Sequence, residues 1–143
     1  EALITLETVA IMPVHVFGTA CNVQKIEEIA KRYNLKVIYD AAHVIETKVY
    51  DKGVLNYGDI SVINLHATKL LNSCEGGAYI TRSYKLNSKL QEIRFYGHDI
   101  RKDVTKQGFN GKMTEVHVAL GLANLKYFDS VLADRKRKYL IYK

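Results

Sequence analysis

The sequence predicts an α/β protein whose sheet is mostly parallel. Short apolar runs alternate along the chain with amphipathic helical patterns, and the first run, helix and second run have the lengths of a strand–helix–strand unit. Helical crossovers of this kind cover a parallel sheet. With 143 residues, 48% of them hydrophobic, the chain can bury the core of about one domain, and no linker-like stretch divides it. We therefore expect one domain over residues 1–143.

The first part of the chain supplies two strands and the helix between them. VAIMPVHVFG, residues 9–18, is an apolar run that ends at Gly18 and predicts a buried strand. NVQKIEEIAKRYN follows, with Asn22 as its N-cap and apolar residues on one helical face. The members of that face are Val23, Ile26, Ile29, Ala30 and Tyr33. LKVIYDAA, residues 35–42, predicts the second strand.

The rest of the chain adds two strands and two helical segments. GDISVINLH, residues 58–66, and GAYITR, residues 77–82, are the strand candidates. A helix should follow from about Ser83, and a long helical pattern begins near Thr114. In the first of these helices, the residues expected to face inward are Leu86, Leu90, Ile93 and Phe95.

The net charge of +6 could indicate a nucleic-acid partner. However, residues 135–138 form a basic block within one helical pattern, which is more typical of a solvated helix face. No apolar run approaches the roughly 18 residues of a membrane span, and no signal peptide is visible. Cys21 and Cys74 match no metal-binding spacing and suit a reducing compartment. We expect a cytoplasmic protein without a metal site and without a nucleic-acid or membrane partner.

Chemically useful side chains follow the predicted strands. Asp40 lies at the end of the second strand, and Lys69 lies just past the third. Because ligands of open parallel sheets bind at the carboxyl ends of the strands, this carboxylate and this amine could converge there. Such a pair permits a pyridoxal phosphate site, in which a lysine reacts with the aldehyde and an aspartate partners the ring nitrogen. Taken singly, Asp40 could be a helix N-cap, Lys69 an exposed lysine, and His43 and His66 structural histidines.

Four blocks of sequence, taken in order, resemble the DegT/StrS family of nucleotide-sugar aminotransferases, which are fold-type-I pyridoxal-phosphate enzymes. The blocks are VIYDAAH (37–43), YGDISVINLHATK (57–69), EGGAYIT (75–81) and NGKMTEVHVALGLANL (110–125). The resemblance implies a three-layer, mostly parallel sheet with helices on both faces. Because family members are much longer, we expect residues 1–143 to be one partial domain, the C-terminal portion of the large domain. The upstream phosphate-binding segment and the C-terminal small domain would then be absent.

The resemblance also implies a role for individual residues. Lys69 matches the lysine that is joined covalently to the cofactor and that later carries a proton between carbons. Asp40 matches the carboxylate that keeps the pyridine nitrogen protonated, and His43 matches a position beside the ring that is more often Gln. Asn64 stands where many members have a phosphate-binding Ser, and its amide can still donate a hydrogen bond. Asn110 matches an asparagine that reaches the cofactor phosphate of the neighbouring subunit, which implies a homodimer.

The activity implied by the resemblance is transamination of a nucleotide-linked keto-deoxy sugar for amino-sugar biosynthesis. The substrate would be a dTDP-4-keto-6-deoxyhexose or a 3-keto isomer, with an amino acid such as glutamate as donor. Two alternatives stay open. One is a dehydratase on the same scaffold, in which a histidine replaces the lysine; Lys69 argues against it, although His66 lies nearby. The other is a non-catalytic fragment or assembly module.

Overall fold

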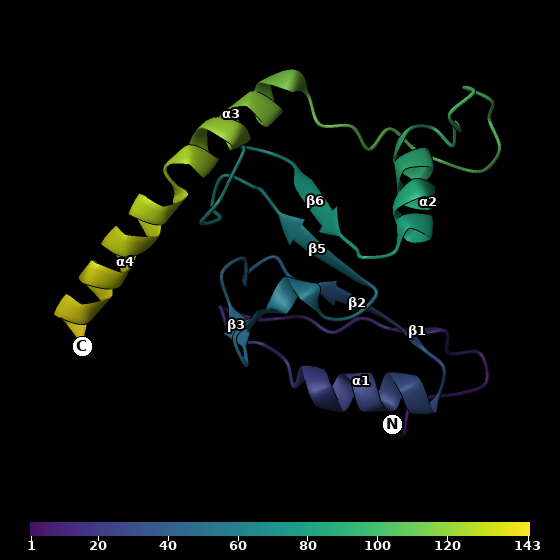
Figure 1. The fold of residues 1–143 in the computed structure, drawn as a ribbon, viewed down its shortest axis with the longest axis horizontal. Helices are drawn as coiled ribbons and strands as arrows, with labels where there is room; N and C mark the ends of the chain where they lie inside the picture. Colours follow the sequence, from purple (N-terminus) through teal and green to yellow (C-terminus); the bar gives the residue numbers. More distant parts are fainter. The chain divides into compact units, whose positions relative to one another are not determined.

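The computed structural model describes residues 1–143 (Figure 1). Four strands form one sheet in the order β1-β2-β5-β6, and β3 and β4 form a short hairpin. The strands are β1 Ala10–Ile11, β2 Lys36–Asp40, β3 Lys48–Val49, β4 Lys52–Gly53, β5 Ile60–Asn64 and β6 Gly77–Ile80. The helices are α1 Val23–Arg32, the 3₁₀ helix η1 Val54–Asn56, α2 Tyr84–Arg94, α3 Glu115–Lys126 and α4 Phe128–Tyr142. The chain forms two compact units, residues 1–63 with 78–112 and residues 64–77 with 113–143.

The sheet is mixed, and most of its pairing is parallel. β1 pairs with β2, and β2 pairs with β5, in parallel, with Asp40 opposite Val62. β6 runs opposite to β5 (Figure 1). The reason lies in the connection, because residues 65–76 contain no helix and parallel neighbours need a long crossover. The predicted α/β class and the order strand–helix–strand, β1-α1-β2, are confirmed. The predicted buried strand over residues 9–18 is wrong, because β1 spans only Ala10–Ile11 and Val9, Met12 and Phe17 are exposed. Pro13, which has no N–H to donate, follows the strand closely.

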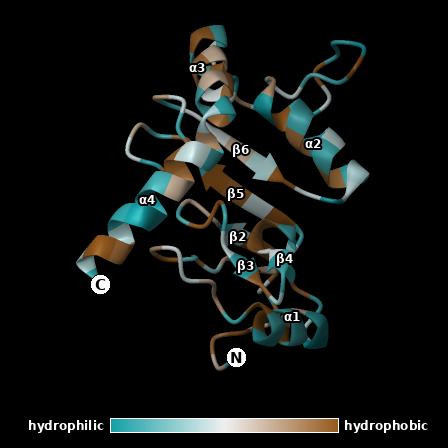
Figure 2. Cartoon of the chain, turned by 60° about the vertical axis from the view of Figure 1, so that its left-hand side comes forward, coloured by the Kyte–Doolittle hydropathy of each residue, from teal (hydrophilic) through white to brown (hydrophobic).

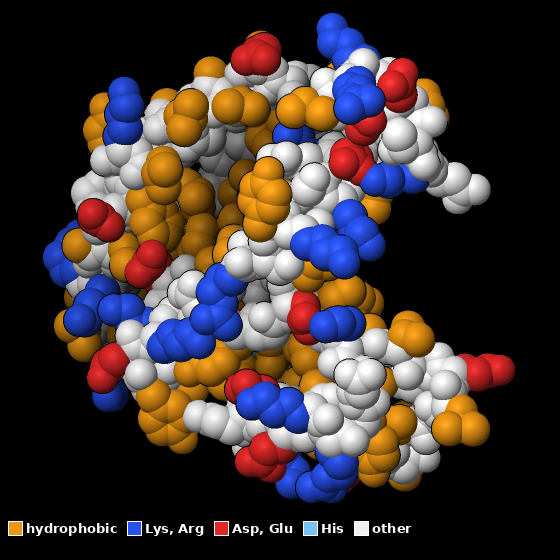
Figure 3. All heavy atoms as spheres, turned by 45° about the vertical axis from the view of Figure 1, so that its right-hand side comes forward, with side chains coloured by type: hydrophobic (Ala, Val, Ile, Leu, Met, Phe, Trp, Pro, Cys, Tyr) orange, Lys and Arg blue, Asp and Glu red, His pale blue; other side chains and the backbone are white.

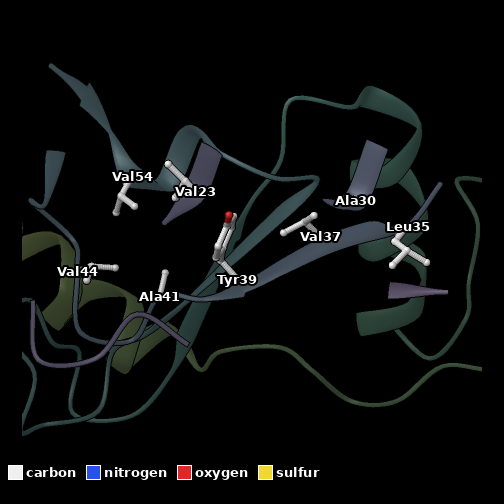
Figure 4. Close-up of a cluster of buried hydrophobic side chains, with 8 residues drawn as sticks. All are labelled: Val23, Ala30, Leu35, Val37, Tyr39, Ala41, Val44 and Val54. Atoms are coloured by element: carbon white, nitrogen blue, oxygen red, sulfur yellow. The ribbon is translucent and has the colours of Figure 1, made fainter. Parts of the chain in front are cut away.

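α1 begins as predicted, and its predicted apolar face packs inward except for Tyr33, which lies one residue past the helix and is 43% exposed. Asn22 is its N-cap, and its side-chain oxygen accepts a hydrogen bond from Lys25 N at 3.0 Å. Val23 and Ala30, from the predicted apolar face, are buried. They join a cluster of buried apolar side chains that forms the core of the first unit (Figure 4). The other members of the cluster are Leu35, Val37, Tyr39, Ala41, Val44 and Val54.

Side chains point alternately to the two faces of β2, and this alternation determines which face carries Asp40. Val37 and Tyr39 are buried in the core, whereas Ile38 and Asp40, on the opposite face of the strand, are half-buried. Hydrophobic residues are also prominent along the neighbouring strand β5 (Figure 2). Asp40 therefore ends a strand that is anchored in the core, while its own carboxylate lies on the other face.

α2 begins at the predicted residue, since Ser83 accepts a hydrogen bond from Leu86 N at 3.3 Å. Leu86, Leu90 and Ile93 are half-buried, in keeping with the predicted inward face. Phe95 differs from the prediction, because it lies one residue past the helix and is 44% exposed. Its predicted inward placement is wrong, since a residue beyond the last helical turn no longer shares the face that the periodicity defines.

α3 and α4 expose many apolar side chains. Thr114 caps α3, and its hydroxyl accepts a hydrogen bond from His117 N at 3.3 Å. Apolar side chains of these two helices that are exposed include Val116, Leu120, Leu122, Leu125, Tyr139 and Ile141. Apolar residues lie on several sides of α3, other than the side that carries Gly121 and Asn124, which is typical of a helix that is buried on more than one side. Hydrophobic side chains are prominent on the face of the molecule drawn in Figure 3.

The basic block of α4 is an exposed helix face, in keeping with its interpretation from sequence. Arg137 and Lys138 form ion pairs with Asp134 at 2.8 and 2.6 Å, at the i+3 and i+4 spacings of a helix. Lys138 and Arg137 together hold the pKa of the Asp134 carboxyl below its ordinary value. Separately, no helix in the structure combines the length and the apolar character that crossing a membrane would require.

His15 is fully buried and is held in its neutral form. Its ring stacks on Tyr39 with 4.5 Å between the ring centroids, and its Nδ1 accepts a hydrogen bond from Cys21 N at 3.0 Å. Nε2 therefore carries the proton of the neutral ring, and this atom is buried without a hydrogen-bond partner. Burial lowers the pKa of the imidazole below its ordinary 6.5, and the charge of Asp40 opposes this only in part.

A depressed pKa at His15 predicts a specific pH dependence of stability. Below the ordinary pKa of 6.5 the unfolded chain binds a proton that the folded chain does not. The free energy of unfolding should therefore fall as the pH is lowered from 6.5 towards the folded-state pKa. In His15→Gln this contribution should be missing, so the loss of stability between about pH 7.5 and about pH 5 should be smaller than in the unaltered chain. Urea unfolding at several pH values measures the difference, and identical pH profiles would contradict the prediction.

Candidate functional site

Asp40 is fixed by main-chain hydrogen bonds to the segment that follows β1. Its N–H donates to Pro13 O at 2.9 Å, and its carbonyl accepts from His15 N at 3.0 Å. In the side chain, Oδ1 accepts a hydrogen bond from Ala42 N at 3.1 Å. Oδ2 makes no hydrogen bond within the chain, so this half-buried carboxylate keeps one oxygen for an external donor. A protonated ring nitrogen is a donor of the required kind.

His43 lies three residues further along, in the turn that follows β2. Its Nδ1 accepts a hydrogen bond from Phe17 N at 3.3 Å, and the two rings are nearly parallel, with 5.5 Å between centroids. Nε2 is consequently the donor nitrogen of the neutral ring. The contact with Phe17 was not predicted from the sequence. The available signal was an aromatic residue directly before Gly18, at the end of the first apolar run.

Asn64 is the last residue of β5, and its amide orientation follows from one short contact. Its Oδ1 accepts a hydrogen bond from His66 N at 2.7 Å. Because the oxygen is used in this way, the NH₂ group is left to donate, and the side chain is exposed. Asn64 therefore keeps a hydrogen-bond donor for an external acceptor.

Lys69 lies in a loop that is closed by main-chain hydrogen bonds. Leu65 N donates to Gly76 O at 2.9 Å, and Ser73 N donates to Leu65 O at 2.8 Å. Lys69 itself donates from its N–H to His66 O at 2.9 Å, and its carbonyl accepts from Asn72 Nδ2 at 3.3 Å. The lysine is half-buried, and its side-chain amine takes part in no ion pair. An amine without a counter-ion is available as a nucleophile once it loses its proton.

The remaining polar groups of this loop hold its shape. The ring of His66 contacts Thr68 Oγ1 at 3.0 Å and Glu75 Oε1 at 3.6 Å. Gly76 has a φ of +137°, and an added Cβ would lie 2.6 Å from Met113 Cε. Only glycine fits there without movement, which agrees with a structural role for the EGG turn.

Asn110 belongs to the first unit and follows a segment that returns to the end of α2. It forms an isolated antiparallel bridge with Phe95, and Gly111 N donates to Arg94 O at 2.8 Å. The side chain of Asn110 is exposed and makes no hydrogen bond within the chain. Both its donor and its acceptor are therefore free for an external group.

The structure thus places the predicted residues in two groups. Asp40 and His43 lie together at the end of β2 in the first unit, which also contains Asn110. Asn64 and Lys69 lie together in the second unit. The convergence of Asp40 and Lys69 on one ligand stays a prediction.

The chemistry of these groups fits pyridoxal phosphate. A carboxylate with a free oxygen suits the protonated ring nitrogen, and an amine without an ion pair suits the aldehyde. Asn64 adds an amide donor for a phosphate oxygen. No cluster of His, Cys, Asp and Glu side chains in the structure could hold a metal ion.

Comparison with known proteins agrees with this chemistry. The model of the DegT/DnrJ/EryC1/StrS aminotransferase family matches residues 1–143. The chain is 43% identical over 143 residues to the dTDP-4-amino-4,6-dideoxy-D-glucose transaminase of Shigella dysenteriae, covering 100% of this chain and 39% of that protein. It is 38% identical over 139 residues to the GDP-perosamine synthase of Caulobacter vibrioides, covering 96% of this chain and 38% of that protein. The chain therefore spans about two fifths of the length of these relatives.

Solved structures give the same result for the fold. The crystal structure of DesI in the presence of its TDP-sugar product superposes with a TM-score of 0.92 at 31% identity, covering 99% of this chain and 36% of that one. Helicobacter pylori PseC, described as an aminotransferase involved in the biosynthesis of pseudoaminic acid, gives a TM-score of 0.82 at 30% identity, covering 90% of this chain and 36% of that one. Because the family match extends over the whole chain, these 143 residues belong to the DegT/DnrJ/EryC1/StrS aminotransferase family.

Proposed function

We propose that this chain is part of a pyridoxal-phosphate-dependent aminotransferase that acts on a nucleotide-linked keto-deoxy sugar. The observation that carries the proposal is the amine of Lys69, which is half-buried on a closed loop and has no counter-ion. The loop fixes the main chain of Lys69, and no carboxylate pairs with its side chain, so the amine is left for an external aldehyde. Family membership and the named activities of the relatives support the same reaction.

The residues of the chain have separate tasks in this proposal. When bound, pyridoxal phosphate supplies an aldehyde for the amine and a ring that accepts electrons. Asp40 accepts a hydrogen bond from the ring nitrogen and keeps it protonated, while His43 lies beside the ring. Asn64 donates to the phosphate through its free NH₂ group. Lys69 Nζ holds and moves the proton at the substrate carbon, as a general acid and base.

The net reaction exchanges two groups between two substrates. The amino group of a donor amino acid, glutamate in our proposal, replaces the keto oxygen of the sugar, and the donor leaves as a keto acid. For the sugar we propose a dTDP-4-keto-6-deoxyhexose or its 3-keto isomer, because the relative named for a dTDP-linked sugar is 43% identical to the chain and the relative named for GDP-perosamine is 38% identical.

The proposal extends to the assembly of the protein. We propose that residues 1–143 form part of a larger three-layer domain with helices on both faces of its sheet. We also propose a homodimer, in which the exposed side chain of Asn110 reaches the cofactor phosphate of the neighbouring subunit. A cytoplasmic location is proposed because Cys21 and Cys74 are free thiols.

Cofactor attachment can be tested on the chain itself. Pyridoxal phosphate should give a visible absorption band, and borohydride reduction followed by peptide mapping should find the label on Lys69. Lys69→Ala should lose the band and the label, because no other amine occupies that loop. Lys85→Ala, which removes an exposed lysine on α2, is the matched control and should keep both.

A band that survives in Lys69→Ala would contradict the assignment of the lysine. A folded, unaltered chain that shows neither band nor label would contradict cofactor binding by these residues. That second result would favour the non-catalytic module.

The substrate proposal is tested with the full-length protein. With glutamate as donor, kcat/KM should be higher for a dTDP-linked 4-keto-6-deoxyhexose than for the GDP-linked equivalent, by roughly tenfold or more if the nucleotide is recognised by specific contacts. Amination is measured by chromatography of the sugar nucleotide. A reversed preference would overturn the choice of nucleotide, and loss of a further hydroxyl group from the sugar without transfer of nitrogen would indicate a dehydratase.

A further inference from the structure

The loop that carries Lys69 is tied to α3 by a chain of side-chain hydrogen bonds. Asn124 Nδ2, on α3, donates to Asn72 O at 2.9 Å and lies 3.4 Å from Asn72 Oδ1. Asn72 Nδ2 in turn donates to Lys69 O at 3.3 Å. Two asparagines therefore connect a helix to the main chain of the lysine, and we refer to them as the asparagine relay. Neither residue was singled out from the sequence.

The face of α3 that meets this loop is small and polar. Gly121 lies three residues before Asn124, so the two share one side of the helix. An added Cβ at Gly121 would lie 3.1 Å from Ser73 Cβ, and Ser73 is fully buried. Met113, just before the helix, lies against Gly76 at the other end of the loop. Apolar residues of α3 such as Leu120 are exposed, so this contact does not arise from the hydrophobic periodicity of the helix.

These contacts restrain the main chain of Lys69 from both sides. The N–H of Lys69 is bonded to His66 O at 2.9 Å, and its carbonyl is bonded to the Asn72 amide. The main chain of Asn72 is in turn bonded to Asn124. A side chain as long as lysine reaches a reproducible position only if its main chain is fixed.

We propose that Asn124 and Asn72 are positioning residues that hold Lys69 where its amine can react. The inference rests on the function proposed above, in which that amine is joined to pyridoxal phosphate. It extends that proposal to two residues that would not touch the cofactor. Loss of the Asn124 amide leaves the carbonyl of Asn72 half-buried without its donor, which loosens the loop.

The test compares Asn124→Leu with a matched variant, Asn87→Leu. Both changes replace a half-buried asparagine on a helix by a neutral residue of similar size, but Asn87 contacts Tyr79 in the other unit. Asn124→Gln, which keeps the carboxamide on a longer side chain, is the rescue variant. Hydrogen exchange of residues 64–77 is measured first, on protein without cofactor.

Pyridoxal phosphate is added next, and the label on Lys69 is quantified after borohydride reduction. In Asn124→Leu the loop amides should exchange faster, and the cofactor concentration that gives half-maximal labelling should rise about three- to tenfold, as expected for one lost hydrogen bond. The pH midpoint of the visible band should also move. Asn87→Leu should change none of these quantities, and Asn124→Gln should recover part of the labelling.

The outcomes separate this inference from the function on which it rests. If the hydrogen-exchange rates of residues 64–77 are unchanged in Asn124→Leu, the asparagine relay is overturned, regardless of the labelling result. Faster exchange with unchanged labelling and an unchanged pH midpoint would overturn the positioning role. Should Asn124→Leu fail to fold, Asn72→Leu tests the same relay at its second member, by the same readouts. Absence of label in the unaltered protein would overturn the proposed function and the positioning role with it, while the exchange data would still decide the relay.

Discussion

Main-chain hydrogen bonds on both sides of Asp40 are the constraint on which the first unit depends. On one side, its N–H donates a hydrogen bond to Pro13 O and its carbonyl accepts one from His15 N. On the other side, Ala41 N donates to Val62 O at 2.8 Å. The end of β2 is therefore fixed between two strands. A slip of one residue would turn the carboxylate into the apolar core, where an unpaired charge is costly. The same register buries alternate residues of β2 and leaves the carboxylate on the other face.

In the second unit, hydrogen bonds hold the loop that carries Lys69. The loop around Lys69 contains no regular secondary structure, yet it is closed by its own main chain and is attached to α3 through Asn124. This attachment explains why α3 has a polar residue on this face, because the Asn124 amide can donate a hydrogen bond to a loop carbonyl and a leucine cannot. A strand end that presents a carboxylate and a loop that presents an amine are the two parts that the proposed cofactor chemistry requires.

Local signals in the sequence were sufficient for much of the fold. The cap at Asn22, the start of a helix near Ser83 and the strand–helix–strand order depend on neighbouring residues and were predicted correctly. The direction of β6 depends on its connection, and the placement of Phe95 depends on where α2 ends, so periodicity alone could not supply them. The candidate site came from strand ends and from ordered blocks that resemble a family. The contact between Asn72 and Asn124 joins distant parts of the chain, and no local pattern encodes it.

The central claim is that Asp40 and Lys69 serve one cofactor. A crystal structure of the full-length protein with pyridoxal phosphate tests it most directly. We predict continuous density from Lys69 Nζ to the cofactor, with a carboxylate oxygen of Asp40 about 3 Å or less from the ring nitrogen. Cofactor density joined to another lysine, or a ring nitrogen that faces a different side chain, would contradict the claim.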